Sequence, residues 1–402
     1  MSEVRVNNLS NENLTGGPTI SGITTFSSPY FFVPPQGDTA SRPQSCPPGS
    51  LRFNTDSAKL EYYKGNTIGW VEIDATNDEL GEKRASDADS SNFGLGHRAV
   101  YGGGGIFPTY APNADAGYKN TISYLTISTL GNSQDFGDLT YKAQNTHAAA
   151  SRTRMLFAGG YSPAGGRVNT INFVEISSTG NASDFGDMTI NREGFASGGN
   201  QIRAVMGGGF INPQYTNVID YATIATTGNS VSFGDLVAGG RTLNQLGGGN
   251  GFSGKVEFIM KFHEQNVLDF VNIMTTGNPV DWGDLHQAHD HESTAVASGV
   301  RGIIAGGNTS QNISYITLAT KGNSQDFGDV SGTQRRAMAG MSDSTRAVFA
   351  NGAEAPSVAD GNSKNTIDYV QIMTLGNTVD FGDSNIASTN MDGHSNGHGG
   401  LG

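Results

Sequence analysis

A single phrase, Gly-Asn-x-x-x-aromatic-Gly-Asp, occurs six times in this chain of 402 residues. The aromatic residue is Phe in five copies and Trp in one, and successive aromatics lie 45 to 54 residues apart. The copies are Gly131–Asp138, Gly180–Asp187, Gly228–Asp235, Gly277–Asp284, Gly322–Asp329 and Gly376–Asp383. A period of this length is typical of proteins built from repeated supersecondary units. Because a catalytic group is rarely needed six times, we interpret the phrase as structural.

Each phrase ends a unit with four segments that we expect to be extended. The first is short and rich in small apolar residues, as in His147–Ala150, and the second is an apolar run that begins with Arg, as in Arg154–Gly160. The third alternates with a period of two, as in Asn120–Ile127, and the phrase is the fourth. Glycine, with 57 residues, suits the tight turns between such strands. Four strands repeated radially predict an all-β chain with a six-bladed β-propeller over residues 85–402.

The unit resembles the kelch repeat, which has a Gly pair after its second strand, an aromatic in its third and a Trp in its fourth. Here the pair is seen at Gly159-Gly160, the third-strand aromatic at Tyr124, and the Trp position holds Phe except at Trp282. The resemblance implies a kelch-like propeller. The fourth unit departs from the pattern, because the run Lys255–Lys261 has no Gly pair and contains Glu257. We expect this unit to be deformed or packed against something else, with the Gly-rich lead-in 247–251 as compensation.

Closure of the ring has two candidate strands. The C-terminal segment around 390–394 is preferred as an extra first strand beside the opening unit, and residues 90–93 are the alternative. Closure matters because an open array leaves an exposed sheet edge.

The N-terminal 80 residues do not repeat. Seven of the 13 prolines lie in residues 1–48, which predicts an extended, stiff arm. Residues 49–80 contain three short strand patterns and predict a small β-meander, which is too small to be stable alone and is expected to be buried by a partner or by its own copies. Residues 1–80 are therefore interpreted as an attachment and oligomerisation region.

The meander pattern, beginning Gly49-Ser50-Leu51-Arg52-Phe53, resembles a short module of bacteriophage fibre and virion proteins. With the repeated phrase and the Gly-rich ending Gly397–Leu401, the chain is similar to virion structural proteins of tailed phages that infect marine cyanobacteria. This resemblance implies a tail or head fibre, or a decorating component, with a propeller on an N-terminal anchor. It implies no enzyme.

Composition limits the function classes. The net charge is −13 and charged residues are 15% of the chain, which argues against nucleic-acid binding. The single Cys46 allows no intramolecular disulfide. No apolar run approaches the ~20 residues of a membrane helix, and the N-terminus does not resemble a signal peptide. We expect synthesis in a host cytoplasm and a final location in the virion.

Loops between the second and third strands vary in length and content, whereas loops between the third and fourth are nearly identical. Variable loops that expose aromatic side chains are typical of a recognition face, although unconstrained loops would look the same. The candidate partner-binding residues are Phe107, Tyr110, Tyr118, Tyr161, Phe210 and Tyr215.

Chemical interpretations of the motifs are weaker. Asp-Phe-Gly also occurs in protein kinases, but the other kinase motifs are missing. The paired Asp residues are interpreted as turn caps rather than cation ligands, and the cluster His286, His289 and His291 as hydrogen-bonded surface residues rather than a zinc site. Copper oxidases with kelch-like propellers need a Cys that this propeller lacks. Sialidase-type propellers need an Arg cluster, but the recurrent arginines suggest a structural ion pair or carbonyl contact.

The sequence therefore predicts a non-enzymatic virion protein without a cofactor or metal. Its expected partners are other virion proteins, further copies of itself and a host-surface glycan or receptor, with no nucleic acid and no membrane insertion. The alternative is a cellular kelch-type interaction or carbohydrate-binding protein.

Overall fold

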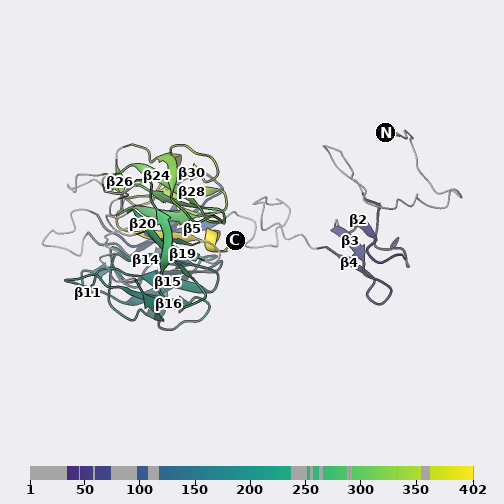
Figure 1. The fold of residues 1–402 in the computed structure, drawn as a ribbon, viewed down its shortest axis with the longest axis horizontal. Coiled ribbons are helices and arrows are strands. Elements are labelled where there is room, and N and C mark those ends of the chain that lie inside the picture. Colours follow the sequence, from purple (N-terminus) through teal and green to yellow (C-terminus); the bar gives the residue numbers. More distant parts are fainter. Residues whose placement is uncertain are drawn as a thin grey trace. The chain divides into compact units, whose positions relative to one another are not determined.

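The computed structural model describes residues 34–73, 97–106, 117–236, 251–261, 266–354 and 363–401, apart from residues 45, 58, 254–256, 288, 290–291, 309 and 333. The chain divides into two compact units, Met1–Glu82 and Lys83–Gly402, which are described separately (Figure 1). Both are built from β-strands, and the predicted all-β class is confirmed. None of the helices in the described ranges has the length and hydrophobicity that a bilayer crossing needs.

The smaller unit is a four-stranded sheet with the order β1-β2-β3-β4. Strands β2 (Leu51–Asn54), β3 (Lys59–Tyr63) and β4 (Trp70–Glu72) form an antiparallel meander, and β1 (Gln36–Gly37) pairs parallel to β2. Residues 36–37, within the segment 1–48 that we expected to be an extended, stiff arm, thus belong to the sheet. Residues 1–33 lie outside the described residues.

The larger unit contains six four-stranded antiparallel sheets in its described part, and in five of them the strands follow the sequence order from the inside outward. The second sheet is β8 (His147–Ala150), β9 (Arg154–Ala158), β12 (Thr170–Glu175) and β13 (Ser183–Asp187). The third sheet is β14 (Ala196–Gly199), β15 (Arg203–Gly207), β16 (Val218–Thr223) and β17 (Val231–Asp235), and the fourth is β18 (Gly251–Ser253), β19 (Glu257–Lys261), β20 (Val267–Asn272) and β21 (Val280–Asp284). The fifth sheet is β22 (Thr294–Ala297), β23 (Arg301–Ala305), β24 (Asn312–Thr317) and β25 (Gln325–Asp329). The sixth sheet is β27 (Ala339–Ser342), β28 (Arg346–Ala350), β30 (Thr366–Gln371) and β31 (Val379–Asp383).

The first sheet combines both ends of this unit. Its inner strand is β32 (Asp392–Ser395), which pairs with β5 (Arg98–Gly102), followed by β6 (Thr121–Thr126) and β7 (Gln134–Asp138). The preferred C-terminal strand is confirmed, while residues 90–93 lie outside the described residues. The inner strands contact one another in the cyclic order β8, β14, β18, β22, β27, β32 and back to β8.

Every outer strand carries a β-bulge at the repeated aromatic. In the first sheet Ile122 pairs with Gly137 and Ser123 with Asp135, so Phe136 is the extra residue of the outer strand. The bulge directs the ring inward, where it is 2% exposed and packs edge-on against Tyr124, with ring centroids 5.9 Å apart. The same bulge and edge-on aromatic pair occur in the other five sheets.

The two halves of the phrase join neighbouring sheets. The N–H of Asp138 in the first sheet donates to the side-chain oxygen of Asn181 in the second (3.1 Å), and the N–H of Gly180 donates to the carbonyl of Phe136 (2.7 Å). We call this contact the clasp. Its Asp–Asn bond recurs between all successive sheets, at Asp187–Asn229, Asp235–Asn278, Asp284–Asn323, Asp329–Asn377 and Asp383–Asn132. The last pair connects the sixth sheet to the first.

The recurrent arginines make a second contact between sheets. Arg346 lies over the ring of Tyr369 in its own sheet, 5.1 Å from the centroid, and donates to the carbonyl of Ile127 in the first sheet (2.8 Å). Equivalent pairs of contacts involve Arg98, Arg154, Arg203 and Arg301. The carbonyl contact predicted for these residues is confirmed.

The fourth sheet keeps the regular pairing of the others, so the expected deformation is not seen. Glu257 pairs with Asn272 at the first position of β19, which is the position of the recurrent arginine. The cation over its third-strand aromatic comes from the next sheet, because the Lys321 ammonium lies 3.6 Å from the centroid of Phe270. Residues 247–250 of the lead-in lie outside the described residues.

Replacement of an outer-strand glycine at a clasp tests the contribution of this contact to stability. Gly382 has φ +149°, and an added Cβ would lie 2.6 Å from the carbonyl of Gly131. We expect Gly382→Ala to lower the free energy of unfolding by at least about 2 kcal/mol, because backbone strain and a clash with rigid backbone add together. Urea denaturation measures the change. The control Gly299→Ala, with no atom within 4 Å of its added Cβ, should change it by less than about 1 kcal/mol. Equal stability of the two variants would contradict the role of the clasp.

Candidate functional site

The two ends of the larger unit differ in character. Hairpins between first and second strands and turns between third and fourth strands lie at one end, and these turns belong to the uniform clasps. Loops between second and third strands lie at the other end, together with the linkers that connect consecutive sheets. We call it the loop end.

At the loop end, the variable loops of the first, second, third and sixth sheets are anchored to a linker by β-pairing. Tyr161 forms a β-bridge with Gln144, and Phe210 forms one with Glu193 and another with Tyr215. Gly105 bridges Tyr118 and Thr389 in the same way, and β29 (Ala353–Glu354) pairs with β26 (Arg335–Arg336). In these four sheets a turn containing glycine follows the second strand, and the next residue (Gly105, Tyr161, Phe210 or Ala353) is held in place by its pairing with a linker. It is aromatic only in the second and third sheets.

Five side chains of the first three sheets form one continuous row, which we call the aromatic ladder: Tyr118, Tyr161, Arg167, Phe210 and Tyr215. The rings of Tyr118 and Tyr161 stack with centroids 6.2 Å apart. The Arg167 guanidinium lies 5.6 Å from the centroid of Tyr161 and 4.4 Å from that of Phe210. Phe210 and Tyr215 pack at 5.0 Å. Tyr118 is buried, and the other four are half-buried.

Buried groups hold the ladder in place. Arg167 forms an ion pair with Glu193 (2.7 Å), and the amide of Asn145 donates to the same carboxylate (2.9 Å). Glu193 is 3% exposed. Rings with fixed orientation and polar edges recognise ligands at a low entropic cost, since few torsions are ordered on binding.

The structure thus brings together four of the six predicted binding residues. Phe107 and Tyr110 lie outside the described residues, as do 107–116 and 355–362 of the two long loops. Arg167 was missed, although a signal was present: it follows Gly165-Gly166 and closes the short hairpin of β10 (Tyr161–Ser162) and β11 (Gly166–Arg167), opposite Tyr161.

Four of the linkers support the loop end with one inserted polar side chain each. The hydroxyl of Tyr141 donates to the carbonyls of Gly159 and Thr170 (2.9 and 3.2 Å). Arg192, His289 and Arg335 reach the corresponding carbonyls or their neighbours in the third, fifth and sixth sheets.

The charge of these inserts matches the third strand that they contact. Arg192 pairs with Asp220 at 3.0 Å, and Arg335 pairs with Asp368. Burial lowers the pKa of Arg192 to about 10, and the charge of Asp220 partly offsets this effect. His289 instead contacts the hydroxyl of Ser314, at 2.6 Å. These inserted side chains thereby fix the turns after the second strands, which carry the variable loops.

The histidine cluster is divided by the fold. His289 is fully buried as a linker insert, so its interpretation as a surface residue was wrong, whereas His286 is exposed and its backbone N–H donates to Ser324 (2.9 Å). His291 lies outside the described residues. Among the residues that the structure describes, no group of three or more His, Cys, Asp or Glu side chains is arranged to hold a metal ion.

Two further histidines are buried at the C-terminus. The rings of His394 and His398 are 4.4 Å apart, and His398 contacts the carbonyl of Ala150 through Nε2 (2.8 Å). Burial lowers the pKa of His398 to about 4 and that of His394 well below 6.5. These neutral rings pack beside the short 3₁₀ helix η3 (Gly399–Leu401), whose last carbonyl accepts from Arg152 (2.9 Å).

A scan against protein-family models finds no match for this chain, and a search of the curated proteins finds no relative. The function is therefore argued from the residues and their geometry.

Acid should destabilise the larger unit through the buried histidines. Because the folded pKa of His398 is below the unfolded value, the unfolded state binds more protons as the pH falls from 6.5 to 4. Stability is then lost over this window, by up to about 3 kcal/mol for His398. Urea denaturation at several pH values should show this loss in the wild type and a flatter profile in His398→Gln. The exposed His286→Gln is the control, and an unchanged slope in His398→Gln would contradict the assignment.

Proposed function

We propose that the larger unit is a six-bladed kelch-like β-propeller. Six equivalent sheets, the cyclic order of their inner strands and clasps that lead from the sixth sheet back to the first support this architecture. Closure by a C-terminal strand beside β5 completes the first blade. A closed ring has no exposed end sheet, which favours a rigid support for loops.

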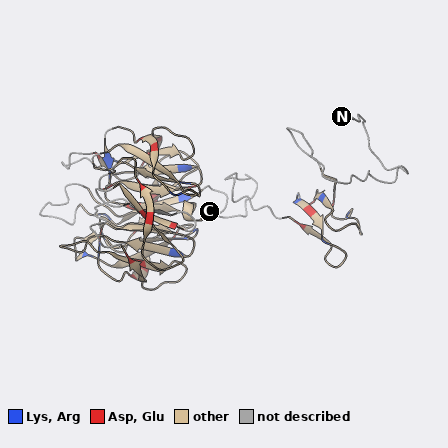
Figure 2. Cartoon of the chain, viewed as in Figure 1, with Lys and Arg blue, Asp and Glu red and all other residues tan. Residues whose placement is uncertain are grey.

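On this support the proposed activity is binding, without catalysis. The aromatic ladder is the observation that carries the proposal, because it concentrates oriented rings and a guanidinium over three blades while the clasp end stays uniform. Half-buried aromatic and arginine side chains are the types that dominate recognition surfaces. Acidic and basic residues are interspersed over the strands of this unit (Figure 2), which does not favour a polyanionic partner.

We further propose that the protein is a virion component of a tailed phage, a fibre or a decoration of the head or tail. Residues 1–80 would attach it to other virion proteins, and the loop end would meet a glycan or receptor on the host surface. The support is the sequence resemblance together with a separate, non-repeating N-terminal unit. The second candidate, a cellular kelch-type interaction or carbohydrate-binding protein, rests on the same ladder but requires no attachment to a particle.

Removal of the ladder rings tests the recognition surface. We expect the double variant Tyr161→Ala/Phe210→Ala to bind cyanobacterial cells or a glycan array at least about tenfold more weakly, because it loses two oriented rings and the support of Arg167. Fluorescently labelled full-length protein measures binding. The control is Leu375→Ala, an exposed position at the clasp end (55% exposed).

The outcome separates the candidates. Equal loss of binding in the double variant and the Leu375→Ala control would contradict the ladder as the site. A ladder-dependent glycan signal in a protein that is absent from purified phage particles, probed with an antibody, would favour the cellular alternative.

A further inference from the structure

The small sheet of residues 34–73 has two faces of opposite character. Residues that pair directly across antiparallel strands share a face, and Arg52 pairs with Glu61, which pairs with Glu72. Asn54 with Lys59 and Tyr63 with Trp70 lie on this same polar face. The alternate residues form the second face, which we call the apolar face: Leu51, Phe53, Leu60, Tyr62, Val71 and Ile73.

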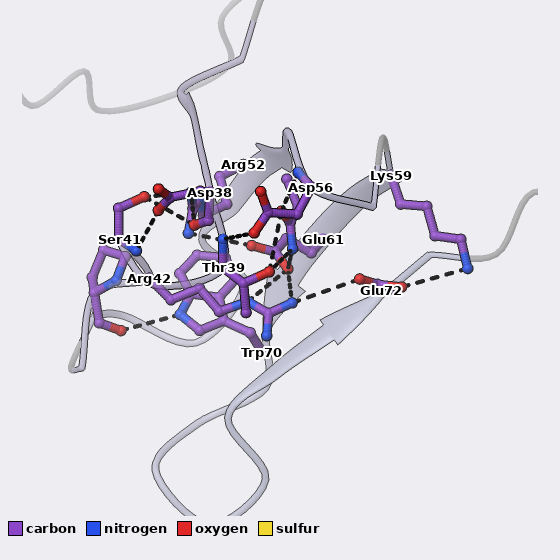
Figure 3. Close-up of polar contacts among 12 residues, drawn as sticks. Asp38, Thr39, Ser41, Arg42, Arg52, Asp56, Lys59, Glu61, Trp70 and Glu72 are labelled. Atoms are coloured by element: carbon purple, nitrogen blue, oxygen red, sulfur yellow. Dashed lines mark hydrogen bonds and ion pairs between the residues drawn. The ribbon is translucent and has the colours of Figure 1, made fainter.

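The chain itself covers the polar face. Arg42 donates to the Glu61 carboxylate through Nε (3.0 Å) and Nη2 (2.6 Å), and Arg52 lies 3.4 Å from the same carboxylate. Trp70 donates to the carbonyl of Pro43 (3.1 Å). Figure 3 shows these side chains converging from the segment before β2 and from all three meander strands. Glu61 is 0% exposed, so the face that ordinarily meets water is sealed.

The apolar face is open in the described part of this unit. Leu51 and Ile73 are 42% and 41% exposed, and the other four side chains are only partly buried. None of the six carries a charge. A small sheet that buries its ions and exposes its apolar side chains reverses the usual arrangement, and an exposed apolar patch marks an interaction surface.

The small size of the sheet indicates what covers its apolar face. A sheet of about 40 residues such as 34–73 usually needs a disulfide, a metal ion or oligomerisation to remain folded. Cys46 is the only cysteine, and the described residues contain no arrangement that could hold a metal ion. Of these three, oligomerisation is left, and it needs a partner chain with a matching face. A second copy of the chain meets this condition, and flat uncharged faces can pack on one another about 10 Å apart without burying a carboxylate of this acidic protein.

We propose that the chain forms a symmetric homo-oligomer in which the apolar faces of residues 34–73 pack against one another. The inference goes beyond the virion proposal and does not depend on it, because it concerns only how this sheet is buried. If the protein assembled through this face but bound no host receptor, the inference about the sheet would still hold.

The mass of the full chain in solution tests the proposal. Light scattering and sedimentation velocity, at concentrations from about 1 to 50 µM because assembly follows mass action, should give a multiple of 42.1 kDa. A wild-type mass of 42.1 kDa over the whole range would overturn the proposal and indicate that another part of the same chain covers the face.

Two lysines on the apolar face should abolish assembly. We expect Leu51→Lys/Ile73→Lys to dissociate more than about 100-fold more readily, since each copy would bury unpaired charges. The control Ile68→Lys places the same charge at a 59% exposed position in the turn between β3 and β4 and should keep the wild-type mass. A double variant with the wild-type mass would contradict the proposal.

Limited proteolysis at Arg42 and Arg52 shows whether the sheet of the double variant is folded. If it is not, Leu51→Thr replaces it, because Thr keeps the strand propensity while removing apolar area. This variant should dissociate about tenfold more readily than the wild type, and an unchanged dissociation midpoint would equally overturn the proposal.

Discussion

The clasp is the contact on which the larger unit depends. A glycine in the outer strand allows the backbone of the next Gly-Asn turn to approach so closely that even a methyl group would collide with it. The side-chain oxygen of the asparagine in that turn then accepts from the backbone N–H of the aspartate that follows the outer-strand glycine, as Asn181 does from Asp138. Because the same contact is made six times and the last copy returns to the first sheet, the position of every sheet is set by both neighbours.

The contacts next to the clasp tolerate exchange of residues. Five sheets place an arginine over the third-strand aromatic, while in the fourth a lysine from the neighbouring sheet lies over that ring. The linker inserts are Tyr, Arg or His, and the two buried arginines each meet an aspartate. What is retained is a cation over a ring and a donor to the turn carbonyls, since an unpaired buried carbonyl or charge would be costly.

Uniformity at one end leaves the other end free to vary. In the five sheets that have a glycine turn after the second strand, the turn holds the loop at the same place, so the side chain after the turn can change without disturbing the strands of the sheet. The second and third sheets use that position for Tyr161 and Phe210, and the glutamate under them orients Arg167. In the smaller unit, burial of Glu61 by Arg42 and Arg52 turns the apolar side of the sheet outward. Each unit therefore presents one surface that its own described residues leave at least partly exposed: the aromatic ladder in the larger unit and the apolar face in the smaller.

The sequence alone determined the repeated four-strand unit, the C-terminal strand that joins the first sheet, and four of the aromatics that meet at the loop end. These follow from periodicity and from turn residues, which act over a few neighbours. Only the tertiary structure decided that Asp138 meets Asn181, that His289 is a buried insert, that Glu257 occupies an arginine position, and that Arg167 joins Tyr161 to Phe210. It also showed that the charged Arg52 and Glu61 of the small sheet are covered by the chain segment before β2, which contributes Arg42. Such contacts join residues far apart in the chain, and their partners are chosen by packing and charge, which no local pattern records.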